Sequence, residues 1–498
     1  MICVSIGRTR HKMVKMEHRA LAEKGAELVE LRLDWIARPA DVDRLIKDRP
    51  TPVVITCRRP ADKGRWNRSE EQRLAVLRTA IVSEVEYVDL EEDIADQIPR
   101  YGKTKRIISH HNFDETPDNL EDIHASLCKK DPDIVKLVTM ANSPEDSIRI
   151  LKLVANAKVP TIGFCMGEYG VISRILCGKY GAPFTYATFS RERELAPGQL
   201  SFSEMTKIYG YDQIGPETAV YGVVGDPIAH SLSPLIHNFA FRHDKIDAVY
   251  LPFRVPKDRL TETLQEFEWL NVQGYSVTIP HKAGALKLAE NADDASESMG
   301  VANTLIRDQN NAWQARNTDY NAALDSIRLG LDPQGTATGD PINGKQVLLL
   351  GAGGVSQAIG AGVVNAGGAL TVSNRSRKRG EKLATELGCA YSSWENRGSS
   401  FYDVLINGTS VGMYPNVNET PFPQNFMHDD MLVFDTVYNP ENTLLLKQSR
   451  ERNCKTVSGI EMFVRQAAAQ YQLFTGKEPP LEVMRKTLRT GISAVGKL

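Results

Sequence analysis

The chain has 498 residues, of which 42% are hydrophobic and 24% are charged, and its 60 Lys and Arg nearly balance its 62 Asp and Glu. This composition is typical of a soluble globular protein of two or three domains, and the balanced charge disfavours a nucleic-acid or membrane partner. The seven cysteines are scattered without CxxC spacing, which indicates neither a disulfide framework nor a zinc site. The sequence has no signal-peptide pattern and no apolar run long enough to span a membrane, so we expect a cytoplasmic protein whose partners are small molecules.

The first 210 residues contain short β-branched runs that alternate with longer amphipathic, charge-rich stretches. Eight runs are predicted as strands, over residues 2–7, 28–34, 52–58, 85–91, 106–112, 134–139, 161–167 and 184–189. Eight strands alternating with helices predict a (β/α)8 barrel.

Several of these runs carry polar side chains near their carboxyl ends, where barrel enzymes hold their chemistry. The residues are Ser5, Glu30, Arg32, Asp34, Arg58, His111 and Lys136. Lys136 stands out, because it lies within the apolar run "DPDIVKLVT" and a buried ammonium is costly unless it is paired or neutral. A lone lysine at a strand end can instead extend to solvent. The whole set indicates an amine nucleophile, a proton carrier and cations for a substrate anion.

Six motifs in this region carry a family resemblance. They are "ELRLD", "TCR", "SHHNFDETP", "DIVKLVT", "GVISRILCGKYGAPFTYA" and "APGQLS". Together they resemble type I 3-dehydroquinate dehydratase over about residues 1–210. The resemblance implies that Lys136 forms a Schiff base with the substrate ketone and that His111 moves protons. It also implies that Arg174 holds the substrate carboxylate, that Glu30, Arg32, Arg58 and Gln199 bind hydroxyls or orient the nucleophile, and that Ser5 assists. We expect burial among cations to keep Lys136 as the free amine.

Two positions depart from that family pattern. Leu195 stands where serine is usual before "APGQ", and Asp62 stands near the usual position of a glutamate after "TCR". We expect these changes to affect a loop over the site and a supporting role, and to leave Lys136 and His111 unaffected.

A linker is predicted at about residues 210–217, followed by a strand over 220–225. Ser231 and Ser233 then precede a predicted helix, where they suit either a bound carboxylate or an ordinary N-cap. Lys282 in "GYSVTIPHK" and Asp319 in "NTD" could be a surface ion pair or a catalytic pair. We predict domains over residues 1–212, over 218–325 completed by 450–498, and over 326–449.

Residues 344–379 read as strand, glycine turn, helix and second strand, which is the context of a dinucleotide-binding fingerprint. Its glycine turn is Gly351, Ala352, Gly353 and Gly354, and Ser356 replaces the third glycine of the fingerprint. The second strand ends in Asn374, Arg375, Ser376, Arg377, Lys378 and Arg379 rather than in an acidic residue. Guanidinium groups favour a 2′-phosphate, so the predicted cofactor is NADP.

Nine motifs in the second half resemble shikimate dehydrogenase over about residues 218–490. They are "SLSP", "SVTIPHK", "VANTL", "NTD", "GAGG", "NRSRKR", "DVLINGTSVGM", "DTVYNP" and "GIEMFVRQAA". The resemblance implies that Ser231 and Ser233 bind the substrate carboxylate, that Lys282 and Asp319 are the catalytic pair, and that Thr278, Asn303, Tyr438 and Gln466 line the substrate site. Departures at Ser276, Arg316 and Gln357 are expected to alter affinity rather than chemistry.

Joined on one chain, the two halves resemble the bifunctional dehydroquinate dehydratase–shikimate dehydrogenases of aromatic biosynthesis. The implied reactions are dehydration of 3-dehydroquinate to 3-dehydroshikimate and its NADPH-dependent reduction to shikimate, a lyase and an oxidoreductase activity of the shikimate pathway. No motif indicates a metal. Two alternatives remain: oxidation of quinate or shikimate with NAD, which the basic run at 374–379 disfavours, and a metabolite-sensing regulator built from degenerate copies of both folds.

Overall fold

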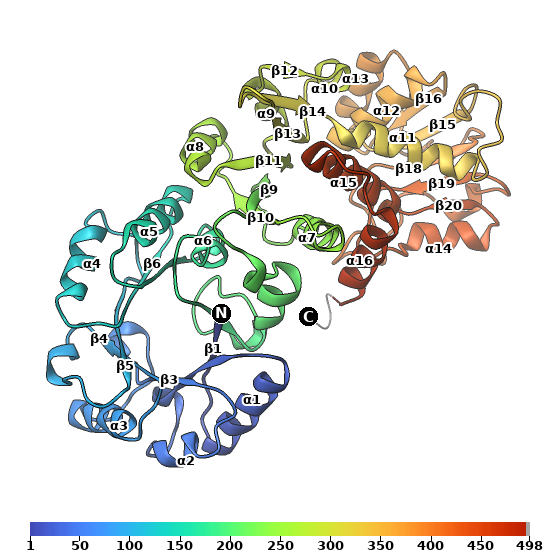
Figure 1. Cartoon of the computed structure of the whole chain (residues 1–498). Coiled ribbons are helices and arrows are strands. Elements are labelled where there is room, and N and C mark those ends of the chain that lie inside the picture. The colour runs from blue at the N-terminus through green and yellow to red at the C-terminus, as the bar shows by residue number, and fades with distance from the viewer. Residues whose placement is uncertain (495–498) are drawn as a thin grey trace. The chain divides into compact units, whose positions relative to one another are not determined.

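The computed structural model describes residues 1–494 and shows an α/β protein (Figure 1). The chain forms two compact units, which are described separately. The first comprises Met1–Pro234 and Ile246–Val272, and the second comprises Leu235–Lys245 and the residues from Gln273 onward. Within residues 1–494, no helix combines the length and the apolar character that a membrane crossing requires.

The first unit is built on an eight-stranded parallel sheet curved into a near-barrel. Its strands are β1 (Ile2–Ile6), β2 (Leu28–Arg32), β3 (Val53–Thr56), β4 (Tyr87–Glu91), β5 (Lys105–His111), β6 (Ile134–Met140), β7 (Thr161–Met166) and β8 (Thr185–Thr188). The strand order is β7-β6-β5-β4-β3-β2-β1-β8, and neighbours pair in parallel. The eight predicted strands and the barrel architecture are therefore confirmed.

α-Helices follow six of the eight strands, all but β4 and β8, and lie on the outside of the sheet (Figure 1). They are α1 (His11–Glu23), α2 (Val42–Ile46), α3 (Glu70–Val82), α4 (Leu120–Cys128), α5 (Pro144–Asn156) and α6 (Val171–Leu176). The start of α5 shows how the sequence sets these boundaries: Ser143 and Asp146 form a capping box, and Pro144 occupies the first turn. The buried side of α5, which includes Ile150 and Val154, faces β7.

The barrel interior changes from apolar to charged along the strand direction. Residues two apart on a strand face the same side, so Cys3 and Ser5 share one side of β1. Cys3 belongs to the apolar cluster with Leu28, Ile107 and Ile134, near the amino ends of their strands. Towards the carboxyl ends the buried residues are polar: Ser5, Glu30, Thr56, Asp89, Ser109 and Lys136. The barrel interior thus has an apolar layer towards the amino ends of the strands and a layer of polar and charged side chains towards their carboxyl ends.

The first unit also contains β9 (Ala219–Gly225) and β10 (Ala248–Arg254), which pair in parallel, and α8 (Leu260–Glu266). The strand predicted at residues 220–225 corresponds to β9.

The second unit contains a small mixed sheet and a larger parallel sheet. In the small sheet, β13 (Thr304–Arg307) is antiparallel to both β11 (Val272–Val277) and β14 (Trp313–Arg316), and β12 (Asn291–Ala292) is parallel to β14. Its helices are α7 (Ser233–His243), α9 (Lys282–Leu288), α10 (Asp294–Met299), α11 (Thr318–Leu331), α15 (Gly459–Thr475) and α16 (Leu481–Ala494).

The larger sheet has the strand order β17-β16-β15-β18-β19-β20, all parallel, which is the order of a Rossmann fold. Its strands are β15 (Gln346–Leu350), β16 (Ala369–Ser373), β17 (Ala390–Ser392), β18 (Val404–Asn407), β19 (Leu432–Asp435) and β20 (Lys455–Val457), and its helices are α12 (Gly354–Asn365), α13 (Arg377–Leu387) and α14 (Leu444–Glu451). The predicted strand–turn–helix–strand unit corresponds to β15, α12 and β16. The finer domain boundaries stay a prediction.

Gly163 lies where α5 packs on the sheet, so a substitution there tests this packing. A Cβ added at Gly163 of β7 would lie 2.5 Å from Val154 Cγ2, so Gly163→Ala should destabilise the first unit by about 1–3 kcal/mol. Hydrogen exchange of β6 and β7 peptides measures the loss, with β15 peptides of the second unit as internal reference.

Val154→Ala removes the atom that the new methyl group would meet. The double variant Gly163→Ala/Val154→Ala should therefore be little less stable than Val154→Ala alone. Additive losses in the double variant would contradict this explanation.

Candidate functional sites

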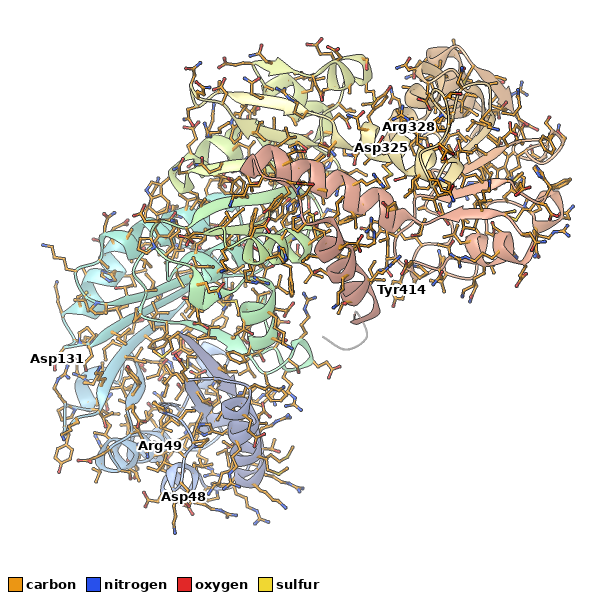
Figure 2. All side chains as sticks on the ribbon, turned by 45° about the vertical axis from the view of Figure 1, so that its right-hand side comes forward. Asp48, Arg49, Asp131, Asp325, Arg328 and Tyr414 are labelled. Carbon is orange, nitrogen blue, oxygen red and sulfur yellow. The ribbon has the colours of Figure 1, made fainter. Side chains whose placement is uncertain are left out.

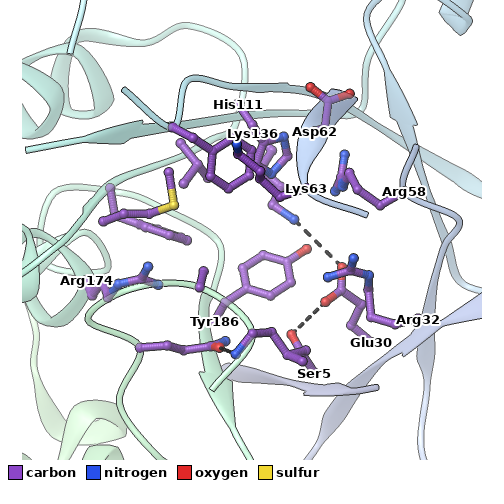
Figure 3. Close-up of a pocket in the computed structure, with 17 residues that line it drawn as sticks. Ser5, Glu30, Arg32, Arg58, Asp62, Lys63, His111, Lys136, Arg174 and Tyr186 are labelled. Carbon is purple, nitrogen blue, oxygen red and sulfur yellow. Dashed lines mark hydrogen bonds and ion pairs between the residues drawn. The ribbon is translucent and has the colours of Figure 1, made fainter. Parts of the chain in front are cut away.

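A pocket opens at the carboxyl ends of the barrel strands, and all eight residues predicted for the first site line it (Figure 3). They are Ser5, Glu30, Arg32, Arg58, His111, Lys136, Arg174 and Gln199. The two departures from the family pattern, Asp62 and Leu195, line the same pocket, together with Lys63, Phe113 and Tyr186. The strand ends thus bring together residues that are up to 194 positions apart, from Ser5 to Gln199.

Lys136 lies in the middle of β6 and is only 4% exposed. Its Nζ is 3.0 Å from an oxygen of Asp89 and 3.8 Å from an oxygen of Glu30. The expectation that Lys136 is buried among cations is therefore incomplete, because its nearest charged partners are two carboxylates. These carboxylates lie where they can stabilise a positively charged nitrogen at this position.

Asp89 is the centre of the buried charge network. Its carboxylate is 3.1 Å from Arg58, 3.0 Å from Lys136 and 2.6 Å from the hydroxyl of Ser109, which donates to it. Burial alone would raise the pKa of Asp89, but Arg58 and Lys136 outweigh burial and hold that pKa well below its usual range. The carboxylate is therefore charged in the resting protein.

Asp89, Glu91 and Ser109 were missed by the reading of the sequence. The signal was present in "VEYVDLE", where Asp89 and Glu91 alternate at the carboxyl end of β4 just as Glu30 and Arg32 do on β2. Glu91 pairs with Arg58 at 3.4 Å and with the fully buried Arg73. These carboxylates raise the pKa of Arg58 above its usual value although burial opposes them.

His111 ends β5, the strand beside β6, and its Nδ1 is buried without a hydrogen-bond partner among residues 1–494. Burial and the positive charges of Arg58 and Lys136 hold the pKa of His111 well below the usual histidine value. His111 is therefore neutral in the resting pocket and able to accept a proton.

Arg174 supplies the cation that the pocket leaves unpaired. It lies on α6 and is 2% exposed, and its Nε and Nη2 have no hydrogen-bond partner among residues 1–494. Burial lowers the pKa of Arg174 to about 10. A buried guanidinium without a counter-ion is costly, so this group is suited to an incoming anion such as a carboxylate.

The remaining predicted residues are already engaged within the protein. Glu30 accepts hydrogen bonds from the hydroxyls of Ser5 (2.6 Å) and Thr56 (2.7 Å). Arg32 is bound to Asp34 through two hydrogen bonds, of 2.9 and 2.8 Å. The side-chain oxygen of Gln199 accepts from the backbone N–H of Leu195, so that oxygen holds its own loop in place.

The second unit places Lys282 and Asp319 together as a pair. Lys282 begins α9, Asp319 lies in the first turn of α11, and Lys282 Nζ is 2.6 Å from Asp319 Oδ2. The side chains keep 25% and 16% of their exposure, so the ammonium is partly open to solvent. The carboxylate of Asp319 therefore orients an ammonium that remains partly accessible.

Asn303 and Ser276 are held by a buried hydrogen-bond network. The Asn303 side chain donates to the hydroxyl of Thr318 at 2.9 Å and accepts from its backbone N–H at 2.9 Å, which fixes the start of α11 next to Asp319. Ser276 donates to Gln470 at 2.7 Å, and Gln470 donates to the backbone oxygen of Asn303 at 3.2 Å. Gln470, which the sequence analysis did not identify, thus connects Ser276 to Asn303 through hydrogen bonds.

Other predicted residues of this half lie on several elements. Thr278 follows β11, and Tyr438 follows β19 and contacts Phe463 at a ring distance of 4.9 Å. Gln466 lies on α15 and donates to the backbone oxygen of Phe463.

In the first unit, Ser231 accepts a hydrogen bond of 3.3 Å from the backbone N–H of Ser233, the first residue of α7. This bond resembles an N-cap, and it does not exclude a carboxylate site. Two residues depart from the shikimate dehydrogenase pattern in this half. Arg316 donates to the backbone oxygen of Ala315, and Gln357 lies on α12.

The glycine turn between β15 and α12 fits a dinucleotide. Gly351 has a φ of +112°, which favours glycine, and a Cβ there would be 2.8 Å from the hydroxyl of Ser356. A Cβ at Gly353 or Gly354 would meet nothing within 4 Å, so the backbone before α12 borders open space. The first-turn N–H groups of α12 can therefore bind a pyrophosphate.

The predicted 2′-phosphate residues follow β16. Asn374 donates to the backbone oxygen of Ser376, and Arg375 and Arg379 are exposed and form no ion pair among the described residues. Arg377 instead pairs with Glu381 at 2.8 Å. The arrangement fits a phosphate between Arg375 and Arg379.

At the same edge of the sheet, the loop after β18 carries Tyr414, which is 68% exposed (Figure 2).

Comparisons with known proteins agree with both halves. The chain matches the models of type I 3-dehydroquinase over residues 2–216, of the shikimate dehydrogenase substrate binding domain over 223–305 and of the shikimate 5'-dehydrogenase C-terminal domain over 459–489. It is 36% identical over 503 residues to the bifunctional 3-dehydroquinate dehydratase/shikimate dehydrogenase, chloroplastic, of Arabidopsis thaliana, covering 97% of this chain and 83% of that protein. It is 37% identical to the NADP(+) shikimate dehydrogenase of Methanosarcina mazei, over 55% of this chain and 99% of that protein. A crystal structure of a shikimate dehydrogenase in complex with NADP+ matches with a TM-score of 0.51 and 30% identity, over 56% of this chain and 97% of that one.

Proposed function

The chain belongs to the family of bifunctional 3-dehydroquinate dehydratase/shikimate dehydrogenases, and from this premise we propose which residues perform each reaction. The first unit dehydrates 3-dehydroquinate to 3-dehydroshikimate. The second reduces 3-dehydroshikimate to shikimate with NADPH, and both steps belong to the shikimate pathway. The observation that carries the proposal is Lys136, a buried amine in contact with Asp89 and beneath a pocket that holds one unpaired guanidinium.

In the dehydratase pocket, the substrate carboxylate binds Arg174, whose guanidinium otherwise lacks a counter-ion. Lys136 gives up a proton, which the neutral His111 accepts, and its amine forms a bond to the ketone carbon. The ketone oxygen leaves as water after protonation by His111, and an iminium remains. Asp89 and Glu30 stabilise the positive nitrogen in the buried site.

The iminium acidifies the neighbouring carbon, so a weak base such as His111 can remove its proton. The electrons of that C–H bond form the ring double bond, and the hydroxyl on the next carbon takes the proton back from His111 and leaves as water. Water then hydrolyses the imine and releases the ketone product and Lys136. Arg32 and Arg58, held by Asp34 and Asp89, are positioned to bind substrate hydroxyls with their remaining N–H groups.

NADPH bound in the second unit would supply the hydride for the ketone carbon, and the alkoxide that develops needs positive charge and a proton. Lys282 provides both, and Asp319 holds its ammonium in place. For the same reaction, we assign the substrate carboxylate to Ser231 and Ser233, and the rest of the substrate site to Thr278, Asn303, Tyr438 and Gln466. Gly351, Ala352, Gly353 and Gly354 receive the pyrophosphate, and Asn374, Arg375, Ser376 and Arg379 receive the 2′-phosphate.

Two further elements of the proposal concern ligands and location. The small-molecule partners are 3-dehydroquinate, 3-dehydroshikimate, shikimate and NADP, with no nucleic acid or membrane. A cytoplasmic location is proposed because the seven cysteines are all free thiols, as in a reducing compartment. The intact Lys136 and Lys282 pairs disfavour a degenerate sensor, and the basic residues after β16 disfavour oxidation with NAD.

The Schiff base can be trapped directly. Borohydride added with 3-dehydroquinate should reduce the iminium and leave a stable adduct on Lys136. Peptide mass spectrometry distinguishes Lys136 from Lys63, the other lysine that lines the pocket. Lys136→Ala should abolish dehydration and leave reduction unchanged. Normal turnover without an adduct, or an adduct on Lys63, would refute the assignment.

The reductase pair can be tested by two substitutions. Lys282→Ala and Asp319→Asn should each lower kcat for 3-dehydroshikimate reduction by roughly 10² or more, the usual scale for a positioned proton donor. Lys287→Ala, on the exposed side of the same helix α9, is the matched control and should have little effect. Steady-state kinetics of both activities decide the question, and near-normal reduction in either variant removes that residue from the mechanism.

Cofactor choice depends on Arg375 and Arg379. Replacing both with Ala should raise KM for NADPH while KM for NADH changes little, because each charge-assisted hydrogen bond contributes about 1.5–3 kcal/mol. The preference for NADPH should fall at least about tenfold.

Arg377→Ala and Lys378→Ala are the matched controls. Arg377 and Lys378 belong to the same basic run as Arg375 and Arg379, and Arg377 is already paired with Glu381. Their effects should be small and should fade at high salt. A preference for NADPH that survives the double arginine substitution would show that another part of the site binds the phosphate.

A further inference from the structure

The dehydratase pocket contains a buried phenol whose hydroxyl has no hydrogen-bond partner in the described part of the chain. Tyr186 lies on β8, opposite Cys3 of β1, and is 4% exposed. It lines the pocket, and its hydroxyl forms no hydrogen bond with any residue that the structure describes. A buried hydroxyl without a partner is costly, and this one is aimed into a pocket rather than into the apolar core.

The ring of Tyr186 is held in one position. It packs against Phe164 and Phe184, with ring centroids 6.2 and 5.7 Å away, and Lys136 Nζ lies 3.9 Å from its centroid. Figure 3 shows the phenol between Arg174 and Glu30, with its hydroxyl directed towards the side of the pocket that holds Glu30 and Lys136. The hydroxyl is thus fixed close to the amine that attacks the substrate.

The phenol is a hydrogen-bond donor under all ordinary conditions. Burial, together with the neighbouring negative charges of Glu30 and Asp89, raises the pKa of Tyr186 well above its usual value. Glu30, one of these two carboxylates, already accepts from Ser5 and Thr56. The Tyr186 hydroxyl is therefore available to an oxygen that arrives with the ligand.

We propose that Tyr186 determines specificity in the dehydratase site by donating a hydrogen bond to the substrate hydroxyl on the ring carbon next to the ketone. This inference rests on the dehydration of 3-dehydroquinate proposed above. The bond from Lys136 fixes the ketone carbon beside the phenol, so only groups on adjacent carbons come within reach. One adjacent carbon is the methylene that loses its proton, and the other carries a hydroxyl.

The test compares Tyr186→Phe with the unchanged protein, because Phe keeps the ring under Lys136 and removes only the hydroxyl. For 3-dehydroquinate, kcat/KM should fall about tenfold, mainly through KM, while 3-dehydroshikimate reduction by the same chain stays unchanged. An unchanged kcat/KM for dehydration, or an equal loss of reduction, would overturn the proposal.

A substrate analogue that lacks the hydroxyl next to the ketone identifies the bonded group. The substitution should cost less than about twofold in affinity for this analogue, measured by borohydride trapping at varied concentration. An equal cost for the analogue and for 3-dehydroquinate would overturn the assignment to that hydroxyl.

Tyr87→Phe is the matched control. Tyr87 begins β4, packs edge-on against Phe184 at 5.8 Å and lies outside the residues that line the pocket. Removing its hydroxyl should leave dehydration unchanged, and a loss equal to that of Tyr186→Phe would make the effect a general one of barrel packing and overturn the proposal. If the unchanged protein neither dehydrates 3-dehydroquinate nor forms an adduct with it, the proposed function itself fails, which is a separate outcome.

Discussion

The contact between Lys136 and Asp89 is the interaction on which the dehydratase half depends. Removing two charges from water costs several kcal/mol per ion, and only close pairing with further hydrogen bonds offsets that cost. The barrel meets this requirement with opposite charges on alternate strands, Glu30 on β2, Asp89 and Glu91 on β4 and Lys136 on β6, and with Arg58 after β3. The strands must therefore keep their register, because a shift by one residue would turn every one of these groups out of the interior.

The two halves use the same pair of groups, an ammonium and a carboxylate, at different depths. Lys136 is 4% exposed, and we propose that its pairing with Asp89 holds an amine for covalent chemistry inside the protein. The Lys282 side chain is 25% exposed, and we propose that its pairing with Asp319 holds a proton donor at an accessible surface. Burial suits covalent chemistry, which needs the amine to lose its charge, whereas partial exposure suits a residue that must be reprotonated after each turnover.

The sequence was sufficient to predict the eight barrel strands, the Rossmann unit and the residues that line the first pocket, because strand ends and glycine turns leave local patterns. It was not sufficient for the balance of charge around Lys136. That balance depends on β4 lying between β3 and β5, and no local pattern states which carboxylate lies nearest an amine 47 residues away. Gln470 shows the same limit, since its partner Ser276 is 194 positions away in the chain. The assigned roles of the site residues stay predictions.

Buried polar atoms in proteins usually have hydrogen-bond partners, and the barrel pocket contains a few that do not. Most polar side chains of this pocket are bonded within the protein, and among residues 1–494 the buried exceptions are nitrogens of Arg174, Nδ1 of His111 and the hydroxyl of Tyr186. They offer a positive charge, a proton acceptor or donor and a neutral hydrogen-bond donor, which are the groups that a ketone bearing a carboxylate and hydroxyls requires. The free energy lost by leaving them unpaired in the empty protein is recovered only by a ligand that satisfies all of them. A ligand that lacks one of these groups leaves a buried partner unbonded, and the pocket discriminates against it for that reason.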